Sequence, residues 1–194
     1  MIEADPISAP NLRPDLATFL GWTAAIAAIS TATLPWHAAI ASIILGALMI
    51  AGADVDARTY LLPDTVTWGT VGSGLLAALA LNSPDPMLGF ESAVARAVGT
   101  ALAMALLRWS YVSLRGEEGM GLGDIKLSAG VGAWLPLDVM PLCFSLAAIG
   151  ALITVVLARF RGRAIYRNTK IPLGAFLCPA LWFVFYLFEL RDYS

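Results

Sequence analysis

The residues of this sequence best suited to chemistry are acids in two short polar segments beside long apolar runs. Six of the fourteen acids fall there: Asp54, Asp56, Asp64, Glu117, Glu118 and Asp124. A carboxylate at membrane depth is costly and needs a pairing or functional reason. Two aspartates brought together from different helices, where the dielectric constant is low, would share a proton. The ionised member of such a pair can activate water while the protonated member donates to a carbonyl oxygen.

The sequence restricts which aspartates can form the pair. Asp54 and Asp56 diverge on a helix, because positions i and i+2 do not share a face, so at most one of them can face Asp124. Asp124 follows the stretch Gly-Met-Gly-Leu-Gly at the predicted start of a helix, where its side chain can cap free N–H groups. The glycines would let another backbone approach closely. A glycine-rich turn that ends in a cap is the purely structural alternative.

The composition indicates an integral membrane protein. Of 194 residues, 59% are hydrophobic and 13% are charged, whereas soluble domains carry about 25% charged residues. The net charge of −2 argues against a nucleic-acid partner. The two cysteines, Cys143 and Cys178, lie in apolar runs without CxxC spacing. We therefore expect buried thiols, no metal site and no cofactor.

The elements that must position the acids are predicted to be membrane helices. Continuous apolar runs without period-two alternation favour an all-α, polytopic helix bundle over a barrel. We expect about seven transmembrane helices, at residues 16–34, 36–53, 65–82, 91–113, 124–136, 139–158 and 172–190. The fifth is short and would need protein around it. Residues 1–15 are expected to form a flexible tail, and residues 16–190 a single transmembrane domain.

The positions of lysine and arginine predict the orientation, because short cytoplasmic loops are enriched in them. A cytoplasmic N-terminus and an external C-terminus place ten of the twelve on the inside: Arg13, Arg58, Arg108, Arg115, Lys126, Arg159, Arg161, Arg163, Arg167 and Lys170. Segments 54–64 and 114–123 then both lie at the cytoplasmic face.

Three motifs resemble the type IV prepilin peptidases, which are GxGD-type intramembrane aspartyl proteases. The sequence "EEGMGLGDIKLSAGVGAWL" is similar to the family's Gly-x-Gly-Asp-x-Lys motif, and "DARTYLLPD" to its first motif, with an aspartate seven residues before a proline. The sequence "IPLGAFLCPA" resembles the third block, with Leu173 in place of the usual Phe and Ala175 in place of the usual second Pro. The resemblance implies Asp56 and Asp124 as the catalytic pair, with Asp54 as the alternative to Asp56.

The resemblance also implies the setting of the reaction. The expected substrates are prepilins or pseudopilins, cleaved after a glycine between a basic cytoplasmic leader and an apolar helix, at the bacterial inner membrane. We expect six residues to contribute to substrate binding: Asp64, Glu117, Glu118, Gly121, Gly123 and Lys126. Lys126 is a partner for an acid or a lipid phosphate, and the basic cluster 158–170 is expected to contact anionic membrane lipid. The chain lacks the CxxC pairs of the longer bifunctional members, which argues against N-methylation.

Two other classes of function use the same residues. In a transporter or channel, acids near broken helices carry ions or protons, but both candidate acids here lie at one face. In a catalytically idle assembly factor, the acids would bind a partner, but retention of both motif aspartates favours the peptidase.

Overall fold

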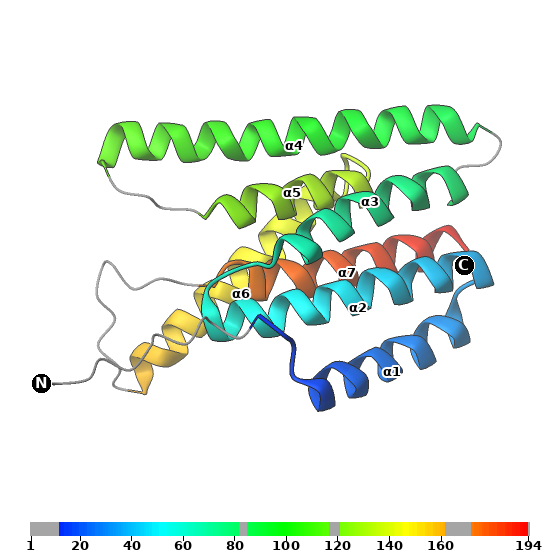
Figure 1. Cartoon of the computed structure of the whole chain (residues 1–194), viewed down its shortest axis with the longest axis horizontal. Coiled ribbons are helices and arrows are strands. Elements are labelled where there is room, and N and C mark those ends of the chain that lie inside the picture. The colour runs from blue at the N-terminus through cyan, green and yellow to red at the C-terminus, as the bar shows by residue number, and fades with distance from the viewer. Residues whose placement is uncertain (1–11, 82–84, 117–120, 162–171, 194) are drawn as a thin grey trace, which may run out of the picture.

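A computed structural model describes residues 12–81, 85–116, 121–161 and 172–193 of the chain (Figure 1). The described residues form seven α-helices, as predicted, and no strand. The helices are α1 (Leu16–Thr33), α2 (Trp36–Thr59), α3 (Asp64–Leu81), α4 (Pro86–Arg115), α5 (Leu122–Trp134), α6 (Met140–Phe160) and α7 (Gly174–Asp192).

Two helices extend furthest beyond their predicted ends, by five or six residues. α2 continues six residues past the predicted end at 53, because polar residues can complete a helix whose last turn leaves the apolar run. It ends at Thr59, because the next residue, Tyr60, has a left-handed φ of 57° and Pro63 follows. α4 begins at Pro86 rather than at 91, since Asp85 accepts a hydrogen bond from the Leu88 N–H and a proline suits the first helical turn.

The helices form a bundle in which α5 is central. α5 packs against α3, α4 and α7, while α2 packs against α1, α3 and α7. Figure 1 shows α4 along one side of the bundle, α1 along the other, and α6 inclined to the rest. The end of α2 and the starts of α3, α5 and α7 lie toward one end of the bundle, which brings the two acidic segments together.

Five helices are long and apolar enough to cross a membrane, namely α1, α2, α4, α6 and α7. α5 has 13 residues, which span about 20 Å and fall short of a hydrocarbon core of about 30 Å. Its residues from Leu127 to Trp134 are mostly buried by neighbouring helices. The protein surroundings that so short a helix requires are therefore present.

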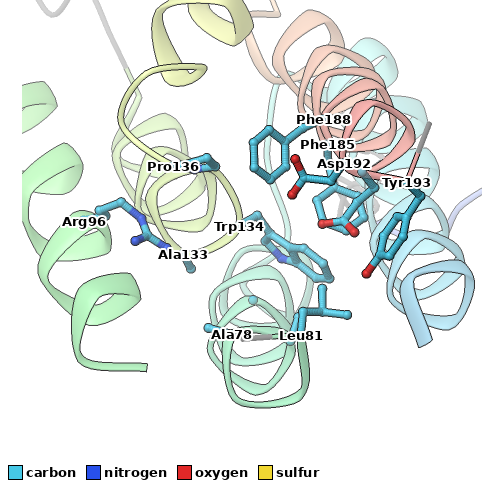
Figure 2. A pocket seen from close by; sticks show the side chains of 13 residues that line it. Ala78, Leu81, Arg96, Ala133, Trp134, Pro136, Phe185, Phe188, Asp192 and Tyr193 are labelled. Atoms are coloured by element: carbon cyan, nitrogen blue, oxygen red, sulfur yellow. The ribbon is translucent and has the colours of Figure 1, made fainter. Parts of the chain in front are cut away.

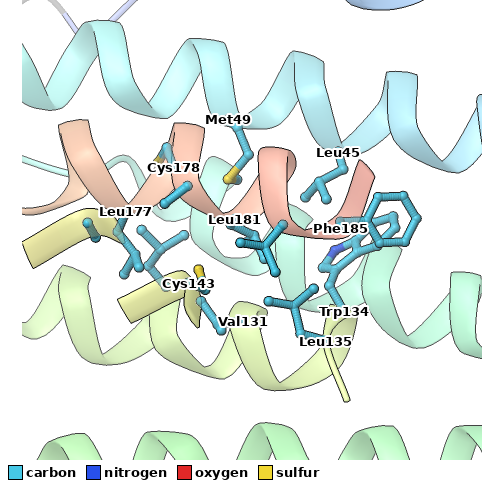
Figure 3. Close-up of a cluster of buried hydrophobic side chains, with 14 of the residues drawn as sticks. Leu45, Met49, Val131, Trp134, Leu135, Cys143, Leu177, Cys178, Leu181 and Phe185 are labelled. Carbon is cyan, nitrogen blue, oxygen red and sulfur yellow. The ribbon is translucent and has the colours of Figure 1, made fainter. Parts of the chain in front are cut away.

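The main core lies between α2, α5 and α7 (Figure 3). Leu45 and Met49 of α2 meet Leu181 and Phe185 of α7, and Trp134 contacts the Phe185 ring edge to face with centroids 4.9 Å apart. Cys143 and Cys178 are buried here as free thiols, as expected. This packing holds α5 and α7 in register, and both helices begin at the candidate site.

Small residues let these helices approach closely, as is common in membranes. A β-carbon at Gly132 of α5 would collide with the Thr100 hydroxyl and the Arg96 carbonyl of α4. One at Gly74 of α3 would lie 2.8 Å from the β-carbon of Ala133 in α5. α5 is thus fixed on two sides by glycine contacts.

Part of the predicted tail contacts the bundle. The Asp15 N–H donates to Asp54 at 2.8 Å, and the Arg58 guanidinium donates to the Arg13 carbonyl at 2.8 Å. The Thr18 N–H and hydroxyl hydrogen-bond to the Asp15 carboxylate, which caps α1, and they hold its pKa below the usual value. Residues 1–11 lie outside the described part of the chain.

Candidate active site

Asp56 lies in the last turn of α2 and is only 4% exposed. Its Oδ2 atom accepts a hydrogen bond from the Ala175 N–H at 2.8 Å, and the Gly174 N–H also donates to this carboxylate. These N–H groups are available because the first turn of a helix has no internal acceptors for them. The start of α7 therefore holds Asp56 in the interior.

Asp124 lies in the first turn of α5 and is partly buried. The helix begins at Leu122, two residues before the predicted start. The Asp124 Oδ2 atom accepts a hydrogen bond from the N–H of Gly121, the residue that precedes the helix, at 3.3 Å, so Asp124 caps a free N–H group as predicted. This contact closes the first turn and orients the carboxylate.

The structure brings Asp56 and Asp124 together. The two carboxylates lie close enough for their charges to interact, and both interact with the thiol of Cys178 in α7. They come from the end of one helix and the start of another, 68 positions apart in the sequence. Packing of three helices therefore brings two acids from distant parts of the sequence into one region.

Leu62 fills the space around this pair. A β-carbon at Gly123 would lie 3.0 Å from the Leu62 β-carbon, and one at Gly174 would lie 2.6 Å from Leu62 Cδ1. The same added β-carbon at Gly174 would lie 2.9 Å from Asp56 Oδ2. The glycines of the second and third motifs thus bring the starts of α5 and α7 against the segment that follows Asp56.

Asp54 has a different environment from Asp56. Its carboxylate forms an ion pair with Arg58 at 2.6 Å and accepts the Asp15 N–H, toward the start of α1. The predicted divergence of the two aspartates is therefore present. Asp54 is already paired, whereas Asp56 lies beside Asp124.

The six predicted substrate-binding residues separate into three groups. Lys126 Nζ is 2.6 Å from Asp64 Oδ1, which links the starts of α3 and α5 at the surface. In the unbound protein, the charge of Asp64 is therefore already compensated. Gly121 lies beside the Asp124 carboxylate, whereas Gly123 packs against Leu62. Glu117 and Glu118 lie outside the described residues.

Comparison with known proteins identifies the family of this chain. A family model described as "Type IV leader peptidase family" matches residues 43–156, more than half of the chain and including both aspartates. The chain belongs to the type IV leader peptidase family.

Relatives named "Prepilin leader peptidase/N-methyltransferase" share about a third of their aligned residues with this family member. The protein of Aeromonas hydrophila is 32% identical over 178 residues, which cover 91% of this chain and 58% of the relative. That of Burkholderia pseudomallei (strain 1026b) is 33% identical over 143 residues, covering 74% and 45%. The chain spans about half the length of the curated relatives it matches. No solved structure matches it.

The sequence analysis gave no structural role to two features of the candidate site, the third motif and Leu62. The third motif was noted only as a resemblance, yet its Gly174 and Ala175 hold Asp56, and Leu62 packs between the motifs. The sequence did carry a signal for the third motif, because a glycine after Ile-Pro-Leu at a predicted helix start supplies free N–H groups. Among the described residues, no group of three or more His, Cys, Asp or Glu side chains could hold a metal ion.

Proposed function

We propose that this chain is an aspartic endopeptidase that removes the leader from prepilin or pseudopilin precursors. The observation that carries the proposal is the convergence of Asp56 and Asp124 at one end of the bundle, with Asp56 held by the start of α7. Family membership and relatives named as prepilin leader peptidases support this substrate class.

In the proposed reaction, the two aspartates share one proton. The ionised carboxylate takes a proton from water as the water oxygen bonds to the scissile carbonyl carbon, and the protonated carboxyl donates to the carbonyl oxygen. As the tetrahedral intermediate collapses, the C–N bond breaks. The first aspartate then returns its proton to the leaving amine, and a hydroxyl of the intermediate reprotonates the second. Water is consumed, and the proton count of the pair is restored.

The site is proposed to face the cytoplasm, in a chain that crosses the bacterial inner membrane several times. Positive charges gather at the end of the bundle that carries the aspartates, as expected for a cytoplasmic end. The described residues of this kind are Arg13, Arg58, Arg115, Lys126, Arg159 and Arg161. A substrate with a cytoplasmic leader and a membrane helix would present its junction at this level.

An apolar pocket beside Asp124 suits the residue that follows the cleaved bond. It has a volume of about 180 Å³ and lies between α4, α6 and the start of α7. Met104, Phe144 and Leu177 contribute to its walls, with Asp124 at its margin. An apolar side chain placed there would bring the preceding peptide bond to the aspartate pair.

We propose cleavage without N-methylation for this polypeptide. The relatives carry both activities in their name. The 194 residues of this chain contain no CxxC pair. A mass measurement of the mature substrate distinguishes the two outcomes, because methylation adds one methyl group to the new amino terminus.

The deciding experiment is co-expression of the chain with a candidate prepilin, scored by the leader shift on a gel. We expect wild-type chain to process the substrate, and Asp56→Asn and Asp124→Asn to abolish processing. Each asparagine keeps the shape of the aspartate but cannot take up or share the proton. Membrane levels of every variant are measured by immunoblot, so that loss of activity is not loss of protein.

Asp54→Asn is the matched control, since it lies two residues from Asp56 on the same helix but pairs with Arg58. We expect this variant to retain processing. Cleavage that survives Asp124→Asn would refute the mechanism, and loss in Asp54→Asn with activity in Asp56→Asn would show that Asp54 is the catalytic residue.

A further inference from the structure

A polar pocket lies at the opposite end of the bundle from the aspartate pair (Figure 2). Asp124 and Ala175 are at the starts of α5 and α7, whereas this pocket is lined by the ends of both helices, including Trp134 and Glu189. Its volume is about 210 Å³. Neither the family match nor the proposed peptidase reaction gives it a role.

Glu189 is the unusual residue of this pocket. Its residue surface is 7% exposed, yet its carboxylate makes no hydrogen bond or ion pair with any residue that the structure describes. Asp192 lines the same pocket three residues later, on the same face of α7, and adds a second negative charge. The Glu189 oxygens are not sealed in the core but reach the pocket, so a ligand in the pocket that donates hydrogen bonds would stabilise this mostly enclosed carboxylate.

Tyr193 and aromatic side chains complete this side of the pocket. The Tyr193 hydroxyl contacts His37 Nε2 at 2.9 Å. Burial, followed by the charges of Glu189 and Asp192, raises the pKa of that hydroxyl, which shows that the three groups lie near one another. Trp134 also lines the pocket and uses its indole N–H on the Thr70 carbonyl. Carboxylates beside aromatic rings form a favourable environment for an ammonium group.

The opposite wall carries a positive charge. Arg96 of α4 is partly buried and donates to the Gly132 carbonyl at 3.2 Å and to the Ser92 hydroxyl at 3.0 Å. It has no carboxylate partner within the described residues. Figure 2 shows Arg96 on one side of the pocket and Asp192 and Tyr193 on the other. A guanidinium in this position is suited to a phosphate.

We propose that this pocket binds a phosphoethanolamine group, with the ammonium at Glu189 and Asp192 and the phosphate at Arg96. The three N–H donors of a primary ammonium can satisfy the two carboxylates, and the separated walls of opposite charge favour a zwitterion over an anion. The pocket is smaller than typical drug-sized sites of about 300–1,000 Å³, which suits a headgroup-sized ligand. The group could belong to a membrane lipid or to a soluble compound.

The test measures binding to the purified full chain in detergent by native mass spectrometry and thermal shift. The probes are a phosphoethanolamine lipid, a phosphocholine lipid, a phosphoglycerol lipid and free O-phosphoethanolamine. We expect the phosphoethanolamine lipid to bind about tenfold or more tightly than the phosphoglycerol lipid, and more tightly than the phosphocholine lipid, whose ammonium has no N–H. Competition by the free compound would assign recognition to the headgroup alone, and binding of the lipid only would assign the source to the membrane.

Glu189→Gln and Asp192→Asn should each weaken binding about tenfold or more, the loss expected for one charge-assisted hydrogen bond. Asp138→Asn is the control, because Asp138 is an exposed acid in the loop after α5 that does not line the pocket. Because Asp192 is exposed, Asp192→Asn should fold normally. Its effect on binding therefore tests the proposal even if Glu189→Gln does not fold. Equal affinity for the three lipids, or unchanged binding in both pocket variants, would overturn the proposal.

Discussion

Gly174→Ala is the substitution that most directly tests how Asp56 is held. A β-carbon at Gly174 would lie 2.6 Å from Leu62 Cδ1 and 2.9 Å from Asp56 Oδ2. Ordinary carbon contacts begin near 3.4 Å, so the carboxylate would have to move by about half an ångström. The Leu62 contact is to the end of a flexible side chain, which can rotate away. The carboxylate is less free, since the Ala175 N–H holds it.

Two magnitudes follow for Gly174→Ala. Overpacking of this kind costs about 1–3 kcal/mol in the free energy of unfolding. A misplacement of about 1 Å in a catalytic group can cost about a hundredfold in rate, so a shift of half that size should slow leader cleavage about tenfold. The cleavage rate is measured on purified chain and substrate, and stability by thermal unfolding in the same detergent.

Two further variants show whether the effects of Gly174→Ala come from its contact with Leu62 or from its contact with Asp56. Gly72→Ala is the matched control, because a β-carbon there meets nothing within 4 Å, and we expect no loss of activity. In the double variant Gly174→Ala/Leu62→Ala, the contact with Leu62 is removed while that with Asp56 remains. We expect stability to recover in part and cleavage to stay slow. A double variant with the wild-type rate, or Gly174→Ala itself with unchanged rate and stability, would refute the reasoning.

Three other predictions concern the supports of the site. Lys126→Met should lower stability by about 1 kcal/mol or less, since its pair with Asp64 is largely exposed; a larger drop in thermal unfolding would contradict this. Gly132→Ala should cost about 3 kcal/mol, because its β-carbon would meet backbone of α4, whereas Gly99→Ala should be neutral or slightly stabilising; equal melting temperatures for the two would show that α4 can move away. Ala175→Pro should fold, since proline suits the first helical turn, and should slow cleavage about tenfold through the lost hydrogen bond; an unchanged rate would show that the bond is dispensable.

The sequence was informative where one physical signal dominates. Seven apolar runs predicted the seven helices of the described residues, because membrane helices need long apolar segments. The choice of Asp56 over Asp54 came instead from the resemblance, through the motif's spacing to Pro63; the structure pairs Asp54 with Arg58, and the catalytic role of Asp56 stays a prediction. The ends of α2 and α4 were less predictable, since polar residues and caps, rather than hydropathy, determine where those helices stop and start.

The contacts around the pair could not be predicted from local signals. Leu62 is an ordinary apolar residue in the sequence, and its position between Gly123 and Gly174 depends on how three helices pack. Glu189 and Arg96 lie 93 positions apart and line one pocket only because α4 and α7 both contact the region around the end of α5. Long-range packing, not periodicity, places these residues.

The third motif can now be given a physical meaning. The family match ends at residue 156, yet the backbone that holds Asp56 begins at Gly174. Where this chain has Ala175, the motif that it resembles usually has proline, which has no N–H. A chain with proline at this position could not form the bond that Ala175 forms here, whereas the close approach at Gly174 does not depend on which of the two residues follows. The spacing of the two aspartates thus depends on a helix that contributes no acid to the pair, and a search restricted to acidic residues would overlook it.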